Sequence, residues 1–147
     1  LLRAEKGFIL VGQETDGTVT PHDLGMGWAV STKKDFLGKR SLSTSALAAA
    51  NRKQLVGLKP HDGNFKLEEG AHIVEMPNLP KPPVPMLGHV TSSYFSPELG
   101  HTFALALIKN GENRKGETLY VPMDGKTIPV EVCDTVFVDK EGKRFNA

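Results

Sequence analysis

The stretch that decides the fold is Thr102-Phe103-Ala104-Leu105-Ala106-Leu107-Ile108, which carries apolar side chains on both faces of an extended chain. Periodicity alone allows either a strand buried on both sides or a short buried helix. The flanking Gly100 and Asn110-Gly111, together with the shortness of the stretch, favour the strand. We therefore expect residues 102–108 to form a strand that is covered on both sides.

Further from this stretch, residues 128–133 show the clearest alternation in the chain. Ile128, Val130 and Val132 would share one face of a strand, while the residues between them share the other. Because proline has no N–H to give to a ladder, Pro129 predicts an edge strand or a bulge. Weaker strand candidates are residues 54–58, 72–74, 86–92 and 118–121.

Turn-favouring pairs separate these apolar segments throughout the second part of the chain. They are Asp62-Gly63, Glu69-Gly70, Asn110-Gly111, Asp124-Gly125 and Glu141-Gly142. About six or seven short strands without a long helix predict an all-β unit, a small barrel or sandwich, because closing a sheet removes its exposed edges. The prolines crowded between positions 77 and 85 predict an irregular surface loop.

The first part of the chain alternates apolar runs with turns. Phe8–Val11 and Trp28–Val30 predict two short strands, and Asp16-Gly17 predicts a turn. Residues 43–51 are small and lack a strand pattern, which leaves a short helix or a linker open. We place a domain boundary there, so that residues 1–48 belong to one domain and residues 52–147 to a second.

Composition excludes several classes of protein. The net charge is +1 and the basic residues are scattered among acids, so no nucleic-acid partner is expected. No apolar run approaches the roughly 20 residues that cross a bilayer, so no membrane partner is expected. A single cysteine points to a reducing compartment, with the cytoplasm as the default. The chain opens without methionine, and we expect it to be a fragment of a longer polypeptide.

Generic catalytic and metal-binding motifs are absent from the sequence. There is no His-Glu-x-x-His, no Gly-x-Ser-x-Gly and no phosphate-binding loop, and the five histidines show no ligand spacing, so no metal is expected. We expect Cys133 to be a small core residue. We also expect His89 and His101 to be partly exposed barrel residues, and Asp16 and Asp23 to satisfy their own backbone.

Arg3 and Glu5 are the first candidate pair of charged residues. On an extended chain both would point to one face, where they could pair with each other or present a cation to an anionic ligand; on a helix they would diverge. From physical chemistry alone, a structural salt bridge is the preferred interpretation.

Two sets of motifs resemble the aminomethyltransferase (glycine cleavage T-protein) family. The set similar to the latter part of its folate-binding fold is Leu2–Gly7, Gly12, Thr20-Pro21, Gly25–Val30 and Phe36-x-Gly38-Lys39. The set similar to its C-terminal barrel is Gly88–Ser93, Ser96–Gly100 and Ala104–Leu107. Together they cover nearly the whole chain in the family's order. The resemblance implies an α+β, mostly β fold, in which residues 1–48 are the C-terminal portion of an incomplete folate-binding domain and residues 52–147 are a small antiparallel β-barrel.

Within the family, residues 12–21, 52–58 and 116–123 are most similar to the alpha subunits of heterotetrameric sarcosine oxidase. The resemblance implies an enzyme complex that oxidises the N-methyl group of sarcosine on a flavin in another subunit. Tetrahydrofolate would capture the one-carbon unit, and the products would be glycine, hydrogen peroxide and 5,10-methylenetetrahydrofolate. It further implies FAD, FMN and NAD elsewhere in the complex, and beta, gamma and delta subunits as partners.

The resemblance also implies site residues. Arg3 matches a family position that contacts folate, and its guanidinium suits the carboxylate-bearing half of that ligand. Glu5, Trp28 and Tyr94 are further candidates, the two aromatic residues because a ring can stack on a pterin or aminobenzoyl group. The family's catalytic aspartate lies upstream of the Leu-Arg-x-Glu motif, so we expect no catalytic residue here and no activity of the fragment alone.

Two departures from the family pattern stand out. Glu14 occupies a position where relatives commonly have aspartate, and Thr135-Val136-Phe137 lacks a proline that often precedes that phenylalanine. Two alternatives stay open beside sarcosine oxidase. One is a dimethylglycine dehydrogenase or a glycine-cleavage aminomethyltransferase, with a flavin in the same chain or a lipoyl carrier as partner. The other is a non-catalytic module for subunit interaction.

Overall fold

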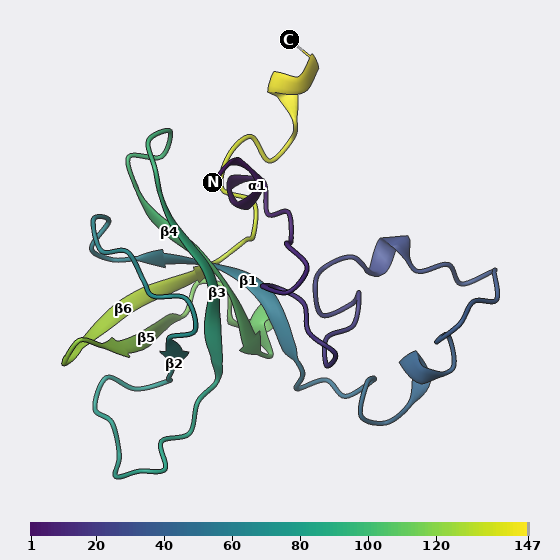
Figure 1. Cartoon of the computed structure of the whole chain (residues 1–147), viewed down its shortest axis with the longest axis horizontal. Helices are drawn as coiled ribbons and strands as arrows, with labels where there is room; N and C mark the ends of the chain where they lie inside the picture. The colour runs from purple at the N-terminus through teal and green to yellow at the C-terminus, as the bar shows by residue number, and fades with distance from the viewer. Residues whose placement is uncertain (147) are drawn as a thin grey trace.

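A computed structural model describes residues 1–146 and contains one six-stranded antiparallel sheet (Figure 1). Its strands are β1 (Lys53–Pro60), β2 (His72–Ile73), β3 (Gly88–Ser96), β4 (His101–Lys109), β5 (Thr118–Met123) and β6 (Lys126–Cys133). The sheet order is β2-β3-β4-β1-β6-β5. Beyond β2, the Val74 N–H donates to the Tyr120 carbonyl at 2.9 Å and the Tyr120 N–H donates back at 3.0 Å. These bonds join the two ends of the sheet, so the predicted small antiparallel barrel is confirmed.

Strand β4 lies between β1 and β3, and all its residues from Thr102 to Ile108 are buried, as the sequence predicts. Alternate side chains enter two different cores. Ala104, Ala106 and Ile108 pack inside the barrel. Phe103, Leu105 and Leu107 pack on its outside with Ala4 and Leu55. A strand covered on both faces needs apolar residues at every position, and this explains the continuous apolar run.

The predicted alternation in β6 is confirmed, but its predicted place at a sheet edge is wrong. Ile128, Val130 and Val132 are buried, and β6 pairs with both β1 and β5. The Pro129 carbonyl accepts a hydrogen bond from the His61 N–H at 3.0 Å, so the backbone of Pro129 faces the β1 side of the strand. Registered pairing with β1 ends at Pro60 opposite Val130. Proline is tolerated because its missing donor would lie just past the end of that ladder.

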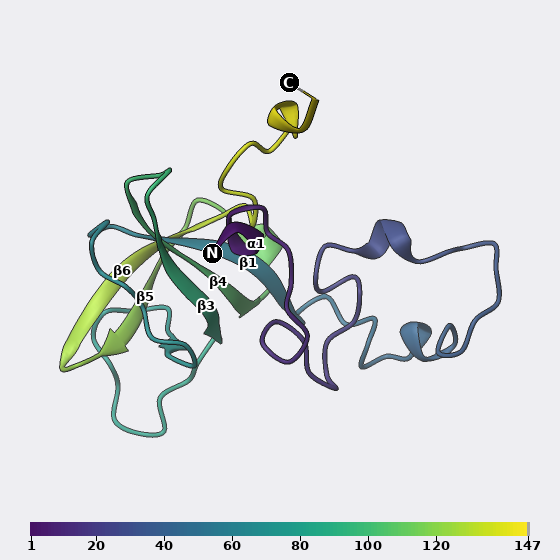
Figure 2. The ribbon, with the colours of Figure 1, turned by 45° about the horizontal axis from the view of Figure 1, so that its top comes forward.

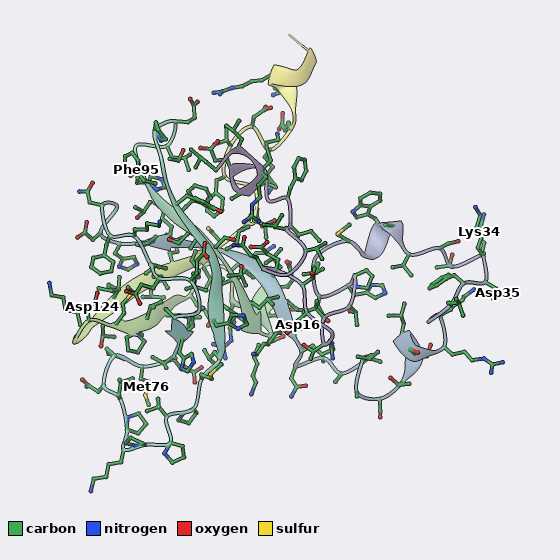
Figure 3. All side chains as sticks on the ribbon, viewed as in Figure 1. Asp16, Lys34, Asp35, Met76, Phe95 and Asp124 are labelled. Atoms are coloured by element: carbon green, nitrogen blue, oxygen red, sulfur yellow. The ribbon has the colours of Figure 1, made fainter. Side chains whose placement is uncertain are left out.

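Two connections follow the predicted turn and loop chemistry. Asp124 (φ 52°) and Gly125 (φ 71°) form the two-residue turn between β5 and β6, which is the tight hairpin that positive φ values permit. The turn lies at the tip of a hairpin that projects from the barrel (Figure 3). Residues 75–87 form an irregular, largely exposed loop that carries Met76 near its start (Figure 3).

The two strands predicted before residue 50 are wrong. Phe8–Val11 has no strand, and Val11 makes only an isolated bridge with Thr15. Trp28 lies in the 3-10 helix η1 (Gly27–Ala29). Strand-like composition does not produce a strand where no partner strand is present among residues 1–146. The remaining short helices are α1 (Leu2–Glu5), η2 (Ser41–Ser43), η3 (Gly111–Arg114) and η4 (Lys143–Asn146).

The N-terminal segment extends from one side of the barrel as a series of turns (Figures 1 and 2). Arg52 fastens it to the start of β1, because its Nε and Nη2 donate to Asp23 at 3.0 Å and 2.6 Å. The Leu55 N–H donates to the Asp23 carbonyl at 2.7 Å. Residues 44–52 form turns and bends, which agrees with a linker rather than a helix; the division at residues 48 and 52 stays a prediction.

Candidate functional site

Arg3 lies on α1 and reaches across to the barrel. Its Nη1 donates to the Glu14 carboxylate at 2.7 Å, and its Nη2 contacts Gln13 at 2.7 Å, Ser92 at 2.7 Å and the Tyr94 hydroxyl at 3.2 Å. Burial opposes the charge, but the hydrogen bonds with Tyr94 and Glu14 outweigh it and raise the pKa of the guanidinium. Arg3 is therefore a fixed cation that joins the N-terminal segment to β3.

Arg3 does not pair with Glu5, so the predicted salt bridge between them is wrong. The two residues lie on the helix α1, where a separation of two positions directs side chains apart. The partner of Arg3 is Glu14, eleven positions along the chain, which no local spacing rule identifies.

Glu14 is a fully buried carboxylate at the centre of this cluster. Its Oε2 accepts from Arg3 and from the Leu10 N–H at 2.8 Å, while its Oε1 accepts from Thr91 at 3.0 Å and from Ser92. Burial favours the neutral acid, yet these bonds, from Ser92 and the Leu10 N–H above all, hold the pKa of Glu14 below its usual value. We call Arg3, Gln13, Glu14, Ser92 and Tyr94 the Arg3 cluster.

Tyr94 is the aromatic member of the cluster. The Arg3 Cζ lies 5.8 Å from the centre of the Tyr94 ring, within the range of a cation–π contact. The ring packs against Phe103 of β4 at 6.1 Å between centroids, and Phe103 in turn packs against Phe137 at 4.5 Å. The barrel core therefore fixes Tyr94 from behind, and its side chain remains partly exposed.

Glu5 is placed apart from this cluster. Its side chain is buried and accepts a hydrogen bond from the Ser96 hydroxyl at 2.5 Å. Its backbone carbonyl accepts from the Phe137 and Val138 N–H groups at 2.8 Å and 3.0 Å. Glu5 also borders a cavity of about 460 Å³ next to Leu2, Lys6 and Pro97, among others. The contacts seen here are those of a residue that holds α1 onto the barrel.

Trp28 is also separate from Arg3 and Tyr94. Its side chain is 84% exposed, and it borders a hollow of about 400 Å³ together with Phe8, Ile9, Leu24 and Met26, among others. Within the described residues, no hydrogen bond or ring contact joins it to the Arg3 cluster. The structure thus brings together two of the four predicted site residues, Arg3 and Tyr94.

Sequence reasoning missed the role of Gln13, Glu14 and Ser92 as supports of Arg3. Gln13 and Glu14 lie inside the family-like stretch 12–21, and Glu14 was noted only as a departure from aspartate. A carboxylate in a turn-rich segment is expected to be exposed to solvent. No neighbouring residue in the sequence shows that strand β3, some 78 positions along the chain, covers it. Membership of that stretch was the one available signal.

Other titratable groups have more ordinary surroundings. Burial, followed by the charges of Glu131 and Asp134, raises the pKa of the Cys133 thiol to about 11. Burial and the Lys53 charge lower the pKa of partly buried His89. Asp16 accepts from the Thr18 N–H and hydroxyl at 2.7 Å and 2.6 Å, as predicted for a turn aspartate.

Two features are absent from the described residues. Across residues 1–146, no helix is both long and apolar enough to cross a bilayer. The same part of the chain holds no group of three or more histidine, cysteine, aspartate or glutamate side chains arranged to bind a metal.

Comparison with known proteins gives several relatives. The chain is 54% identical to the sarcosine oxidase subunit alpha of Corynebacterium sp. (strain U-96) over 145 residues, 98% of this chain and 15% of that subunit. It is 41% identical to the subunit alpha of Rhizobium meliloti (strain 1021), again over 15% of that subunit. It is 31% identical to the aminomethyltransferase of Thermosipho melanesiensis, over 92% of this chain and 35% of that protein. The chain thus spans about a seventh of the alpha subunits that it matches.

A solved structure and a family model agree with these relatives. The aminomethyltransferase T of the Bartonella henselae glycine cleavage system superposes with a TM-score of 0.76 and 25% identity, over 95% of this chain and 37% of that one. The model of the glycine cleavage T-protein C-terminal barrel domain matches residues 53–139, which include every strand of the sheet. The chain therefore belongs to the glycine cleavage T-protein C-terminal barrel domain family.

Proposed function

We propose that this chain is the C-terminal part of a sarcosine oxidase alpha subunit, and that its Arg3 cluster contributes to the site where tetrahydrofolate captures the one-carbon unit released from sarcosine. The observation that carries the proposal is the 54% identity to sarcosine oxidase alpha subunits over 98% of the chain. Identity to aminomethyltransferases is lower, at 31% and 32%. The flavins and NAD, the beta, gamma and delta subunits, and the cytoplasmic location belong to this proposal as well.

The donor chemistry of the Arg3 cluster fits the carboxylate-bearing half of a folate. The Nη2 of Arg3 carries two hydrogens but has three partners, of which the Tyr94 hydroxyl at 3.2 Å is the most distant. A ligand oxygen can replace Tyr94 without leaving a buried acceptor unpaired. The displaced hydroxyl is then free to donate to the same ligand, beside a ring that can stack on it.

Glu14 has a positioning role in this proposal. It neutralises Arg3 and is itself held by Thr91 and Ser92 of β3, so the guanidinium keeps one orientation before a ligand arrives. Bound tetrahydrofolate would supply the nucleophilic amine for the one-carbon unit. The residues of this chain would hold and orient it, which supplies rate through proximity. Glu5 and Trp28 remain predicted contacts in the same proposal.

The test compares variants of the intact parent enzyme. Arg3→Lys keeps a cation near Glu14 but removes the planar fork, and Tyr94→Phe keeps the ring but removes the hydroxyl. We expect the Kd for tetrahydrofolate to rise about tenfold or more in Arg3→Lys, because a charged hydrogen bond contributes roughly 1.5–3 kcal/mol. Flavin reduction by sarcosine should not change. Arg114→Lys is the matched control, since Arg114 pairs with Glu75 and Glu117 away from the cluster.

Two results would count against the proposal in different ways. Unchanged folate affinity in both variants would favour the interaction module, in which the barrel only supports its neighbours. A parent polypeptide that lacks flavin and releases ammonia from an aminomethylated lipoyl carrier would favour a glycine-cleavage aminomethyltransferase. Sarcosine-dependent peroxide formation, with folate-dependent loss of free formaldehyde, is the expected outcome.

A further inference from the structure

Residues 8–11 have one satisfied backbone edge and one free edge. The Phe8 N–H donates to the Arg3 carbonyl at 2.8 Å, and the Leu10 N–H donates to Glu14 at 2.8 Å. The Phe8 carbonyl accepts from Arg3, and the Leu10 carbonyl accepts from residues 13 and 14. By contrast, apart from the isolated bridge of Val11 with Thr15, neither the N–H nor the C=O of Ile9 or Val11 has a hydrogen-bond partner within residues 1–146.

This alternation is the pattern of an extended segment with one bonded side and one open side. On an extended chain, the N–H and C=O of one residue point to the same side, and successive residues point to opposite sides. Phe8 and Leu10 are therefore used on the side of the Arg3 cluster, while Ile9 and Val11 present two donors and two acceptors on the other side. Open edges of this kind accept an added strand.

The side chains beside the free edge are apolar and uncovered. Phe8 is 63% exposed, Leu10 50% and Val11 84%. The hollow of about 400 Å³ that Phe8 and Ile9 border is also lined by Leu24, Met26 and Trp28, among others. An apolar hollow next to unpaired backbone, flanked by three exposed apolar side chains, favours an interaction site over a solvated loop.

The relatives indicate what kind of chain segment could cover the free edge at Ile9 and Val11. Both sarcosine oxidase alpha subunits and aminomethyltransferases match nearly the whole of this chain, and in both the match covers only part of a longer polypeptide. The name of the sarcosine oxidase relatives, subunit alpha, implies partner subunits. The name of the aminomethyltransferases implies none, so the longer polypeptide is what the two groups have in common. The match covers only 15% and 35% of these polypeptides, so a segment from the remainder of the same polypeptide is the occupant that both groups can supply.

We propose that Phe8–Val11 is an edge strand that pairs with a segment of the same parent polypeptide lying outside these 147 residues. That segment is extended, bonds to the Ile9 and Val11 peptide groups and places an apolar side chain in the hollow next to Phe8. The Phe8 carbonyl accepts from the Arg3 Nη1 at 3.2 Å, so the added strand lies one peptide strand away from the Arg3 cluster. This inference is independent of the ligand that the cluster binds.

Residue-resolved hydrogen exchange on the parent polypeptide tests the pairing. The Ile9 and Val11 amides should exchange at least a hundredfold more slowly than their intrinsic rates, as is expected for the paired amides of β4. The amides of the exposed loop at residues 76–86 give the unpaired reference. Exchange of Ile9 and Val11 at the rate of this loop would overturn the proposal.

Cross-linking identifies the occupant. A photoreactive residue placed at Val11 of the parent polypeptide should attach to another segment of the same chain, and Phe95, 48% exposed on the far part of β3, provides the control position (Figure 3). Attachment of Val11 to another subunit or to a second copy of the chain would overturn the assignment. Val11 has no side-chain burial to lose, so the replacement leaves the fold intact.

Discussion

At the residue scale, the Arg3 cluster depends on the negative charge of Glu14, whose side chain is fully buried. Glu14 is buried completely and balanced by one guanidinium, one backbone N–H and two hydroxyls. A buried carboxylate with so many donors is stable only while all of them are present, because each lost bond leaves a desolvated charge. Glu14 therefore couples three segments of the chain, residues 3–10, residues 13–14 and strand β3.

The first prediction concerns Glu14→Gln. The amide keeps the shape but loses the charge-assisted bonds, so the free energy of unfolding should fall by about 2 kcal/mol at pH 7. The folded-state pKa of Glu14 lies below its ordinary value of 4.5, so its stabilisation is present above that value and is lost as pH falls through the folded-state pKa. Urea unfolding between pH 7 and pH 3 should show a shallower decline for the variant. Glu68→Gln, at an exposed position outside the ion pairs described, should match the wild type.

The second prediction concerns Cys133. With its pKa raised to about 11, the thiol is almost entirely protonated at neutral pH, and only the thiolate is alkylated. At pH 8 the thiolate fraction should be about a hundredfold lower than for a thiol at the ordinary value of 9.0. Iodoacetamide labelling followed by mass spectrometry should show that slow rate in the folded chain and a fast rate in urea. Equally fast labelling in both states would contradict the raised pKa.

At the element scale, strand packing leaves no space for a side chain at one point of β3. A Cβ atom built on Gly88 would lie 1.9 Å from the Leu107 carbonyl oxygen. The Gly88↔Ile108 register places this contact between β4 and β3, the strand that also carries Ser92 and Tyr94 of the Arg3 cluster. The glycine is required by the close approach of two backbones.

The third prediction follows from that contact. Gly88→Ala should lower the free energy of unfolding by about 3 kcal/mol, because backbone must move to admit the methyl group. Gly17→Ala is the matched control, since its Cβ meets nothing within 4 Å and its φ is not positive. Thermal unfolding of both variants checks this, and equal midpoints would show that β3 and β4 separate more easily than the structure indicates.

At the scale of the whole molecule, Arg52 is the side chain that fastens residues 18–46 to the start of β1. It donates to Asp23 and to the carbonyls of Thr18 and Ala46. It holds both ends of residues 18–46 next to the start of β1. The segment has only short 3-10 turns of its own, so its arrangement depends on this arginine.

The fourth prediction is that Arg52→Ala loosens the segment without unfolding the barrel. Asp23 would lose its cation while partly held by Thr20, and residues 18–46 should be cut by trypsin at least tenfold faster. The barrel strands should stay resistant. Arg114→Ala removes an equally buried arginine that pairs with Glu75 and Glu117, and it should leave cleavage of this segment unchanged. Simultaneous cleavage of segment and barrel would show that the two unfold together.

Local sequence patterns predicted the barrel. The doubly apolar run 102–108, the alternation in 128–133 and the Asp124-Gly125 turn are local patterns, and each produced the predicted element. The resemblance to the aminomethyltransferase family likewise rested on short local motifs. These features were predictable because burial on one or both faces of a strand leaves its period in the sequence.

Three features could not be predicted from local sequence. They are the partners of Arg3, the position of β6 inside the sheet, and the absence of strands at Phe8–Val11 and Trp28–Val30 within the described residues. Arg3 meets Glu14 and Ser92 because α1 packs against β3, which is a contact between distant parts of the chain. A strand also needs a neighbour, and composition cannot state whether that neighbour lies within the same 147 residues. Pairing is a non-local property, and for this reason a local pattern predicted the strands correctly inside the barrel and failed outside it.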